Sequence, residues 1–151
     1  MSERASVQEE SGHLWRKQVL PIGEVDYRGW RTIDFTKDYL DRLVEAFDEG
    51  AYDRVPFQLA DESGQHTSDP AQWRGDVLKL EVVADGLDIL VTVTEQGSDV
   101  LRRDPALGAA PRIIEDYHRA DGRVFPAAIQ HILGTRDPLI TGLRPWCLAS
   151  S

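Results

Sequence analysis

Residues 73–94 read WRGDVLKLEVVADGLDILVTVT, two apolar runs on either side of the turn Ala84-Asp85-Gly86. In the second run, Leu87, Ile89, Val91 and Val93 alternate strictly with other residues, which is the period of a β-strand with one buried face. A short turn containing Asp and Gly between two such runs is typical of a β-hairpin. We therefore expect two paired strands here, and a fold built mainly of strands.

The flanking sequence adds helices and further strands. Residues 36–50 carry apolar side chains at helical spacing, with Thr36 as a cap and Gly50 as a stop. A second, shorter helix is expected over 95–103, capped by Thr94. Strands are also expected over 109–118 and 123–134, around Ala120-Asp121-Gly122, and short ones between 17 and 32. Short connections favour antiparallel pairing, so the pattern predicts an α+β domain with two or three helices.

Length and composition limit the broad class. The chain has 151 residues, which fits one domain, and we expect a flexible polar tail over 1–15 followed by the domain over 16–151. A formal net charge of −9 argues against a primary nucleic-acid binder, because phosphate binding needs clustered Lys and Arg. The sequence has no long apolar run and no signal-peptide pattern, so we expect a protein that neither spans a membrane nor is secreted. One cysteine, Cys147, fits a reducing compartment.

The histidines are the side chains most suited to catalysis. A serine or cysteine protease needs a nucleophile, an imidazole that takes its proton, and a third group that orients the imidazole. His66 follows an apolar segment in a polar loop, where a side chain can reach a cleft, and His131 shares a strand face with Ile129 and Leu133. Taken alone, His66 fits a surface histidine and His131 a hydrogen-bonded core histidine. His13 and His118, in the tail and beside a turn, are poorer candidates.

Four sequence blocks change this interpretation. They are Thr94-Glu95-Gln96-Gly97, Leu107-Gly108-Ala109-Ala110-Pro111-Arg112-Ile113, the run from Phe125 to Pro138, and Gly142-Leu143-Arg144-Pro145-Trp146. Together they resemble the core of the capsid maturation (prohead) proteases of tailed phages, a family similar to the herpesvirus assemblin proteases. The resemblance covers about Val55 to Trp146. It implies a compact, mostly antiparallel β-barrel surrounded by a few helices.

The resemblance also implies a site. The family carries a serine before an Arg-Ile pair, and Ala110 stands at that position. His66 would then be the general base and His131 the third member of a Ser-His-His triad, with Asp137 and Asp69 as alternative third members. Arg112 or Arg136 would support the oxyanion; a solvated surface arginine is an equally simple interpretation of each.

Alanine has no nucleophilic atom, so this chain is expected to be inactive, through either an engineered substitution or a natural loss. Ser63, Ser68 and Ser98 do not stand at the family's position, and we expect Cys147 to be packed rather than reactive. A natural pseudo-protease that acts as a scaffold component in procapsid assembly is the alternative function. Metal-dependent hydrolysis with His66, Asp69, His118 or His131 is a weaker alternative, because paired ligands at helical spacing are missing from the sequence.

The resemblance implies partners and a location as well. The substrates would be capsid and scaffold proteins and the protease itself. Cleavage would take place inside the procapsid, in the host cytoplasm. No cofactor is implied, and no nucleic acid or membrane partner. A homodimer is expected by resemblance to the assemblins.

Overall fold

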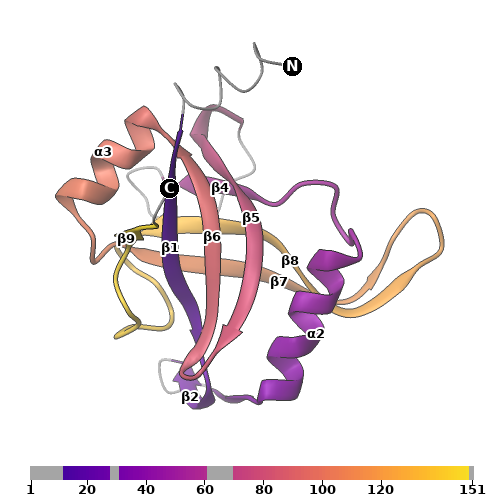
Figure 1. Ribbon diagram of the computed structural model, residues 1–151. Helices are drawn as coiled ribbons and strands as arrows, with labels where there is room; N and C mark the ends of the chain where they lie inside the picture. Colours follow the sequence, from indigo (N-terminus) through magenta and orange to yellow (C-terminus); the bar gives the residue numbers. More distant parts are fainter. Residues whose placement is uncertain (1–11, 28–30, 61–69, 150–151) are drawn as a thin grey trace.

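The computed structural model describes residues 12–27, 31–60 and 70–149, and in these ranges it forms an α+β domain made mostly of strands (Figure 1). A seven-stranded sheet has the order β7-β8-β4-β5-β6-β1-β9, and β2 and β3 form a separate pair. The strands are β1 (Gly12–Pro21), β2 (Gly23–Tyr27), β3 (Arg31–Phe35), β4 (Pro56–Leu59), β5 (Trp73–Val83), β6 (Gly86–Thr94), β7 (Gly108–His118), β8 (Val124–Thr135) and β9 (Cys147–Leu148), and the α-helices are α2 (Lys37–Asp48) and α3 (Glu95–Arg103).

The hairpin predicted from residues 73–94 is confirmed as β5 and β6, which pair antiparallel up to Val83 and Gly86. The four alternating residues of β6 are fully buried, as their period predicts. On its other side β6 pairs with β1, which begins at Gly12 opposite Thr94. The strand therefore includes residues 12–15, which the sequence pattern assigns to a flexible tail, because β6 is long enough to pair with them.

Both helices begin at the caps that the sequence predicts. The Thr36 Oγ1 accepts a hydrogen bond from the Tyr39 N–H at 3.0 Å, and the Thr94 Oγ1 accepts one from the Gly97 N–H at 3.1 Å. Helix α2 turns Leu40, Leu43 and Ala46 inward, and α3 buries Leu101. Each helix thus contributes one apolar face to the core.

The sheet is not closed into a barrel, which corrects the expectation drawn from the resemblance. Strand β7 contacts β1, but the free edge of β1 is paired with β9 at Trp15 and Arg16 instead. Most ladders are antiparallel, as expected, while β4 and β8 pair in parallel. The sheet therefore ends at β7 on one side and β9 on the other.

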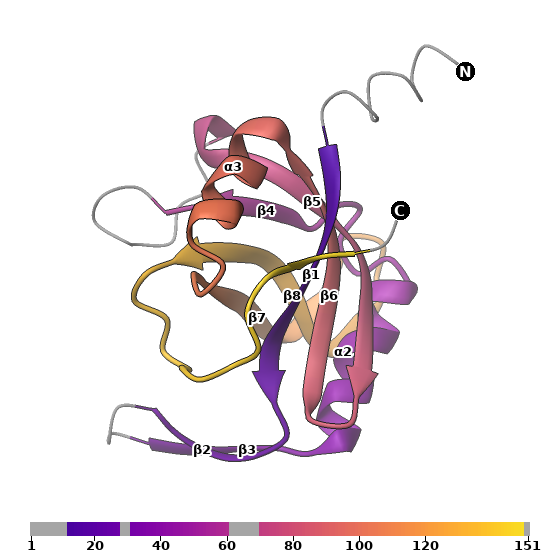
Figure 2. The same cartoon turned by 60° about the vertical axis from the view of Figure 1, so that its left-hand side comes forward.

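The strongly bent sheet encloses the core. Strands β1, β6 and β5 cross in front of β8 and β7 in Figure 1, and the turned view in Figure 2 shows α2 beside the strands and β2 and β3 at one end. Helix α2 contacts β8, β5 and β6. Trp146 fills the space between the layers, where its ring lies 6.5 Å from Trp15 and 5.2 Å from Phe57, measured between ring centroids. Within the described ranges, neither helix has the length and apolar character needed to cross a membrane.

Candidate functional site

Ala110 lies near the start of β7, half-buried, directly opposite Leu133 of β8. Strand β7 is an edge strand, and Pro111, which has no N–H to donate, follows Ala110 in it. Because neighbouring residues of a strand point to opposite faces, Ala109 turns to the core and Ala110 to the other face. The Ala110 methyl group is therefore on the face of the sheet away from the main core.

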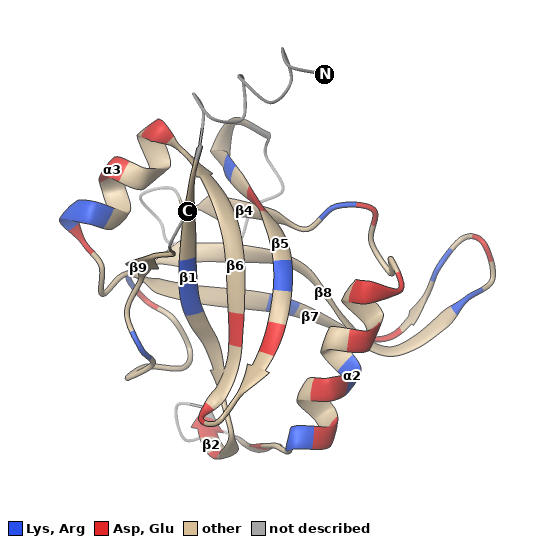
Figure 3. Cartoon of the chain, viewed as in Figure 1, with Lys and Arg blue, Asp and Glu red and all other residues tan. Residues whose placement is uncertain are grey.

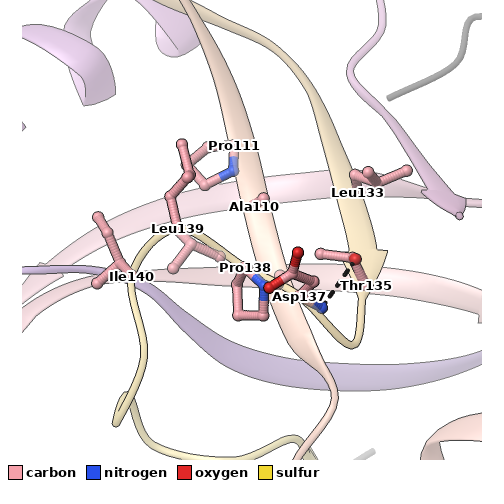
Figure 4. A pocket seen from close by; sticks show the side chains of 10 residues that line it. Ala110, Pro111, Leu133, Thr135, Asp137, Pro138, Leu139 and Ile140 are labelled. Atoms are coloured by element: carbon pink, nitrogen blue, oxygen red, sulfur yellow. Dashed lines mark hydrogen bonds between the residues drawn. The ribbon is translucent and has the colours of Figure 1, made fainter. Parts of the chain in front are cut away.

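A pocket of about 130 Å³ adjoins this methyl group. Figure 4 shows Ala110 between Leu133 and Thr135 of β8 on one side and the segment after β8 on the other. That segment supplies Pro138, Leu139 and Ile140 to the wall. The pocket is lined by Val19, Ala109, Ala110, Pro111, Leu133, Thr135, Asp137, Pro138, Leu139 and Ile140.

His131 of β8 lies on the same face as Ala110. The register pairs Ala110 with Leu133 and Arg112 with His131, so Ala110 and His131 are diagonal neighbours, two residues apart along either strand. Diagonal neighbours of this kind are about 7 to 8 Å apart. His131 is 7% exposed. Aromatic side chains can reach across such a separation, so the His131 ring and the side chain at position 110 are near neighbours on one face of the β7–β8 ladder.

The other predicted members of the triad fall outside the described residues. His66 and Asp69 lie in 61–69, as do Ser63 and Ser68. The described chain before this gap ends at Ala60, whose N–H donates to the Gly134 carbonyl at 2.9 Å. Gly134 in turn is opposite Ala109 in the β7–β8 ladder. The chain that leads to His66 therefore departs one strand away from the pocket.

Asp137 lines the pocket, whereas Arg112 and Arg136 are exposed and do not line it. The Asp137 N–H donates to the Thr135 Oγ1 at 3.1 Å, which forms a turn at the end of β8. Asp137 lines the pocket together with Ala110, and Arg136 is exposed between two lining residues. Arg112 is exposed opposite His131. Burial and then Tyr117 raise the pKa of the Tyr52 hydroxyl, and the charge of Arg112 partly offsets this rise, which locates Arg112 near Tyr52.

The remaining described candidate nucleophiles and histidines do not line this pocket. Ser98 is fully buried, and its Oγ accepts a hydrogen bond from the Trp15 Nε1 at 3.0 Å. Cys147 is exposed in β9, so the expectation that it is packed is wrong: it is Trp146, the residue before it, that turns inward. His13 contacts Glu95 at 2.9 Å, and His118 is exposed at the end of β7.

Sequence reasoning missed Gln58, a buried polar residue of β4. Gln58 is 4% exposed and is paired in register with Leu133, which sets it on the same face as His131. Within the described residues its Oε1 has no hydrogen-bond partner. The sequence signal for this residue is its amide side chain, which stands in the otherwise apolar segment 55–60. The pocket walls Leu139 and Ile140 were also missed as site residues, although they belong to the conspicuous run Asp-Pro-Leu-Ile.

A cluster of charges holds the chain after the pocket against β1. Arg144 forms ion pairs with Asp85 at 2.8 Å and with the buried Asp88 at 2.6 Å. In Figure 3, basic and acidic bands lie side by side across β1, β6 and β5. Lys17 is 3% exposed, and its Nζ donates to the carbonyls of Gln18 and Arg144 at 2.9 and 2.7 Å. Burial, followed by the charge of Arg144, lowers the Lys17 pKa to about 8, against the opposing effect of Asp88.

Comparison with known proteins assigns no family, since no family model matches the chain and no curated protein matches it. Among the described residues, no group of three or more His, Cys, Asp or Glu is arranged to hold a metal ion. The arrangement that remains for chemistry is a small apolar pocket with position 110 in its wall and a buried imidazole nearby.

Proposed function

We propose that this chain is the catalytic domain of a capsid maturation (prohead) protease related to the assemblins, with Ala110 in the position of the nucleophile. Such an enzyme is a serine endopeptidase that cuts capsid and scaffold proteins, and itself, inside the procapsid. The observation that carries the proposal is the position of Ala110, in the wall of a pocket and diagonal to the buried His131. The strongly bent, mostly antiparallel sheet is compatible with an assemblin-like fold.

The position of Ala110 and His131 on one face of the β7–β8 ladder is compatible with two members of a triad. In a triad the base lies between the nucleophile and the third member, which do not touch each other. In the proposed arrangement, the His66 imidazole stands between the side chains of this diagonal pair. His66 follows Ala60 by six residues, which span at most about 20 Å, so it can reach this position from beside Gly134.

Each residue then has one task. A serine at position 110 would attack the peptide carbonyl, and His66 would take its proton and return it to the leaving amine. His131 would hold His66 in the required tautomer through a hydrogen bond. A neutral imidazole stabilises the imidazolium less than a carboxylate does, so slow turnover is expected. With a methyl group at position 110, the chain as it stands is inactive.

A direct test replaces the methyl group with the missing hydroxyl. Diisopropyl fluorophosphate reacts with activated serines: the Oγ–P bond forms, the P–F bond breaks, and the hydroxyl proton passes to the base. We expect intact-mass spectrometry to show one adduct on Ala110→Ser and none on the parent chain. Ala109→Ser is the matched control, because it places a hydroxyl one residue away on the opposite face. The proposal fails if Ala110→Ser reacts no faster than Ala109→Ser.

A natural pseudo-protease that serves as a scaffold component is the second candidate. The observation that favours it is that the pocket stays open around the Ala110 methyl group, so that a peptide could bind without being cut. If the rest of the catalytic arrangement has also been lost, Ala110→Ser will remain unlabelled.

A further inference from the structure

The walls of the pocket beside position 110 are mostly aliphatic. Leu133, Pro138, Leu139, Ile140 and Val19 supply aliphatic carbon from three separate parts of the chain. Its polar side chains are those of Thr135 and Asp137, where the Thr135 hydroxyl accepts a hydrogen bond from the Asp137 N–H. The interior surface that a ligand would meet is therefore mostly aliphatic.

The position of the pocket decides which part of a substrate would enter it. Resting on the function proposed above, position 110 carries the atom that attacks the peptide carbonyl. The side chain of the residue that owns this carbonyl is the substrate group nearest the nucleophile, and it must occupy whatever space adjoins it. In this chain that space is the aliphatic pocket, since Ala110 itself is part of the wall.

We infer that the pocket makes the protease selective for a medium-sized aliphatic side chain, such as that of leucine, isoleucine or valine, immediately before the cleaved bond. The volume supports this size: a cavity of about 150 Å³ holds a molecule as large as benzene, and this pocket is about 130 Å³. An indole is too large for it, and an alanine side chain leaves most of it empty. An acidic side chain would lose its water among aliphatic groups and meet the like charge of Asp137, which is unfavourable.

The experiment uses Ala110→Ser and a series of peptidyl diphenyl phosphonates that differ only in the side chain next to phosphorus. In the reaction the serine Oγ–P bond forms, one phenoxide leaves, and the hydroxyl proton is transferred to it through the base. We expect the leucine probe to label at least about tenfold faster than the alanine, tryptophan and aspartate probes. Equal rates, or a preference for lysine, aspartate or tryptophan, would overturn the inference.

A pocket variant ties the preference to this site. Leu139 is 47% exposed, so Leu139→Trp can fill the pocket from its rim without disturbing the core. We expect Leu139→Trp, in the Ala110→Ser background, to lower the ratio of the leucine rate to the alanine rate about tenfold or more. Leu148→Trp is the control, because Leu148 is similarly exposed, at 53%, and does not line the pocket. An unaltered ratio of the leucine to the alanine rate in Leu139→Trp would contradict the assignment.

Failure of this inference can be told from failure of the proposed function. The small fluorophosphate reports only whether the serine is activated. If it labels Ala110→Ser and the phosphonate series shows no aliphatic preference, the protease function stands and the selectivity is wrong. If it does not label Ala110→Ser, the function is wrong and the selectivity falls with it.

Discussion

Gly108 and Pro138 touch so closely that a Cβ atom on Gly108 would lie 2.5 Å from the Pro138 Cγ. Gly108 begins β7 two residues before Ala110, on the same face, and Pro138 belongs to the segment that walls the pocket. The absence of a side chain at Gly108 therefore lets this segment lie directly on the strand. We infer that the contact sets the shape of the pocket.

Substitution of Gly108 tests the role of this contact. A methyl group there cannot be accommodated by a small rotation, because the proline ring is rigid. We expect Gly108→Ala to lower the free energy of unfolding by about 1 to 3 kcal/mol in urea titrations. In the Ala110→Ser background it should also slow labelling by the leucine phosphonate.

The matched control for this prediction is the double variant Gly108→Ala/Pro138→Gly, compared with Pro138→Gly alone. Glycine at position 138 removes both the ring and the Cβ, which would lie 2.5 and 2.8 Å from the new methyl group, so the two substitutions should be non-additive, with a coupling of at least about 1 kcal/mol. Purely additive effects would show that the contact with Pro138 is not the reason why position 108 requires glycine.

The buried Lys17 gives the stability a defined pH dependence. Its pKa is about 8 in the folded protein, lowered from the ordinary lysine value of 10.5 that applies to the unfolded chain. Between these values the unfolded chain keeps a proton that the folded protein has lost, so this residue makes the free energy of unfolding rise with pH across the window. The full rise is about 3 kcal/mol, and below pH 8 the contribution is constant.

The measurement compares the parent chain with Lys17→Met by urea unfolding from about pH 7 to pH 10.5, because other groups also titrate in this range. We expect the stability of the parent to increase relative to Lys17→Met as the pH rises. A difference that is independent of pH would mean that Lys17 keeps an ordinary pKa.

In the proposed triad, His131 affects the reactivity of a serine at position 110 through the base. In the Ala110→Ser background we expect His131→Gln to reduce the rate of fluorophosphate labelling about tenfold or more, and to change its pH profile, because the base is no longer held in one tautomer. Glutamine keeps hydrogen-bonding capacity at this buried position, and thermal unfolding should verify that the fold is retained. His118→Gln, in the same hairpin but exposed, should leave both rate and profile unchanged. If the two variants behave alike, His131 has only a packing role.

The local elements of this fold were predictable because their signals lie close together in the sequence. Strict alternation identified β6, the turn Ala84-Asp85-Gly86 identified its hairpin with β5, and Thr94 and Thr36 identified both helix caps. Each of these depends on residues a few positions apart. Hydrophobic period and capping chemistry are sufficient at that range.

Features that depend on distant segments were missed. Strand β4 has four residues and pairs in parallel with β8, more than seventy residues later, which no local pattern indicates. Pairing of β9 with β1 prevents closure of a barrel, yet β9 has only two residues. For the site, the sequence indicated that His131 shares a strand face with Leu133, but Ile129, which was expected on the same face, packs in the main core because the β7–β8 register shifts between Arg112 and Ile113. The walls of the pocket come from a segment whose folding against Gly108 is a tertiary effect.

The most direct test of the central claim is a crystal structure of Ala110→Ser in which residues 61–69 are traced. We expect a ring nitrogen of His66 within about 2.6 to 3.2 Å of the introduced serine Oγ, with the His131 ring on the far side of His66. A structure in which the His66 ring points away from position 110, with another group between the introduced hydroxyl and His131, would contradict the proposed protease site.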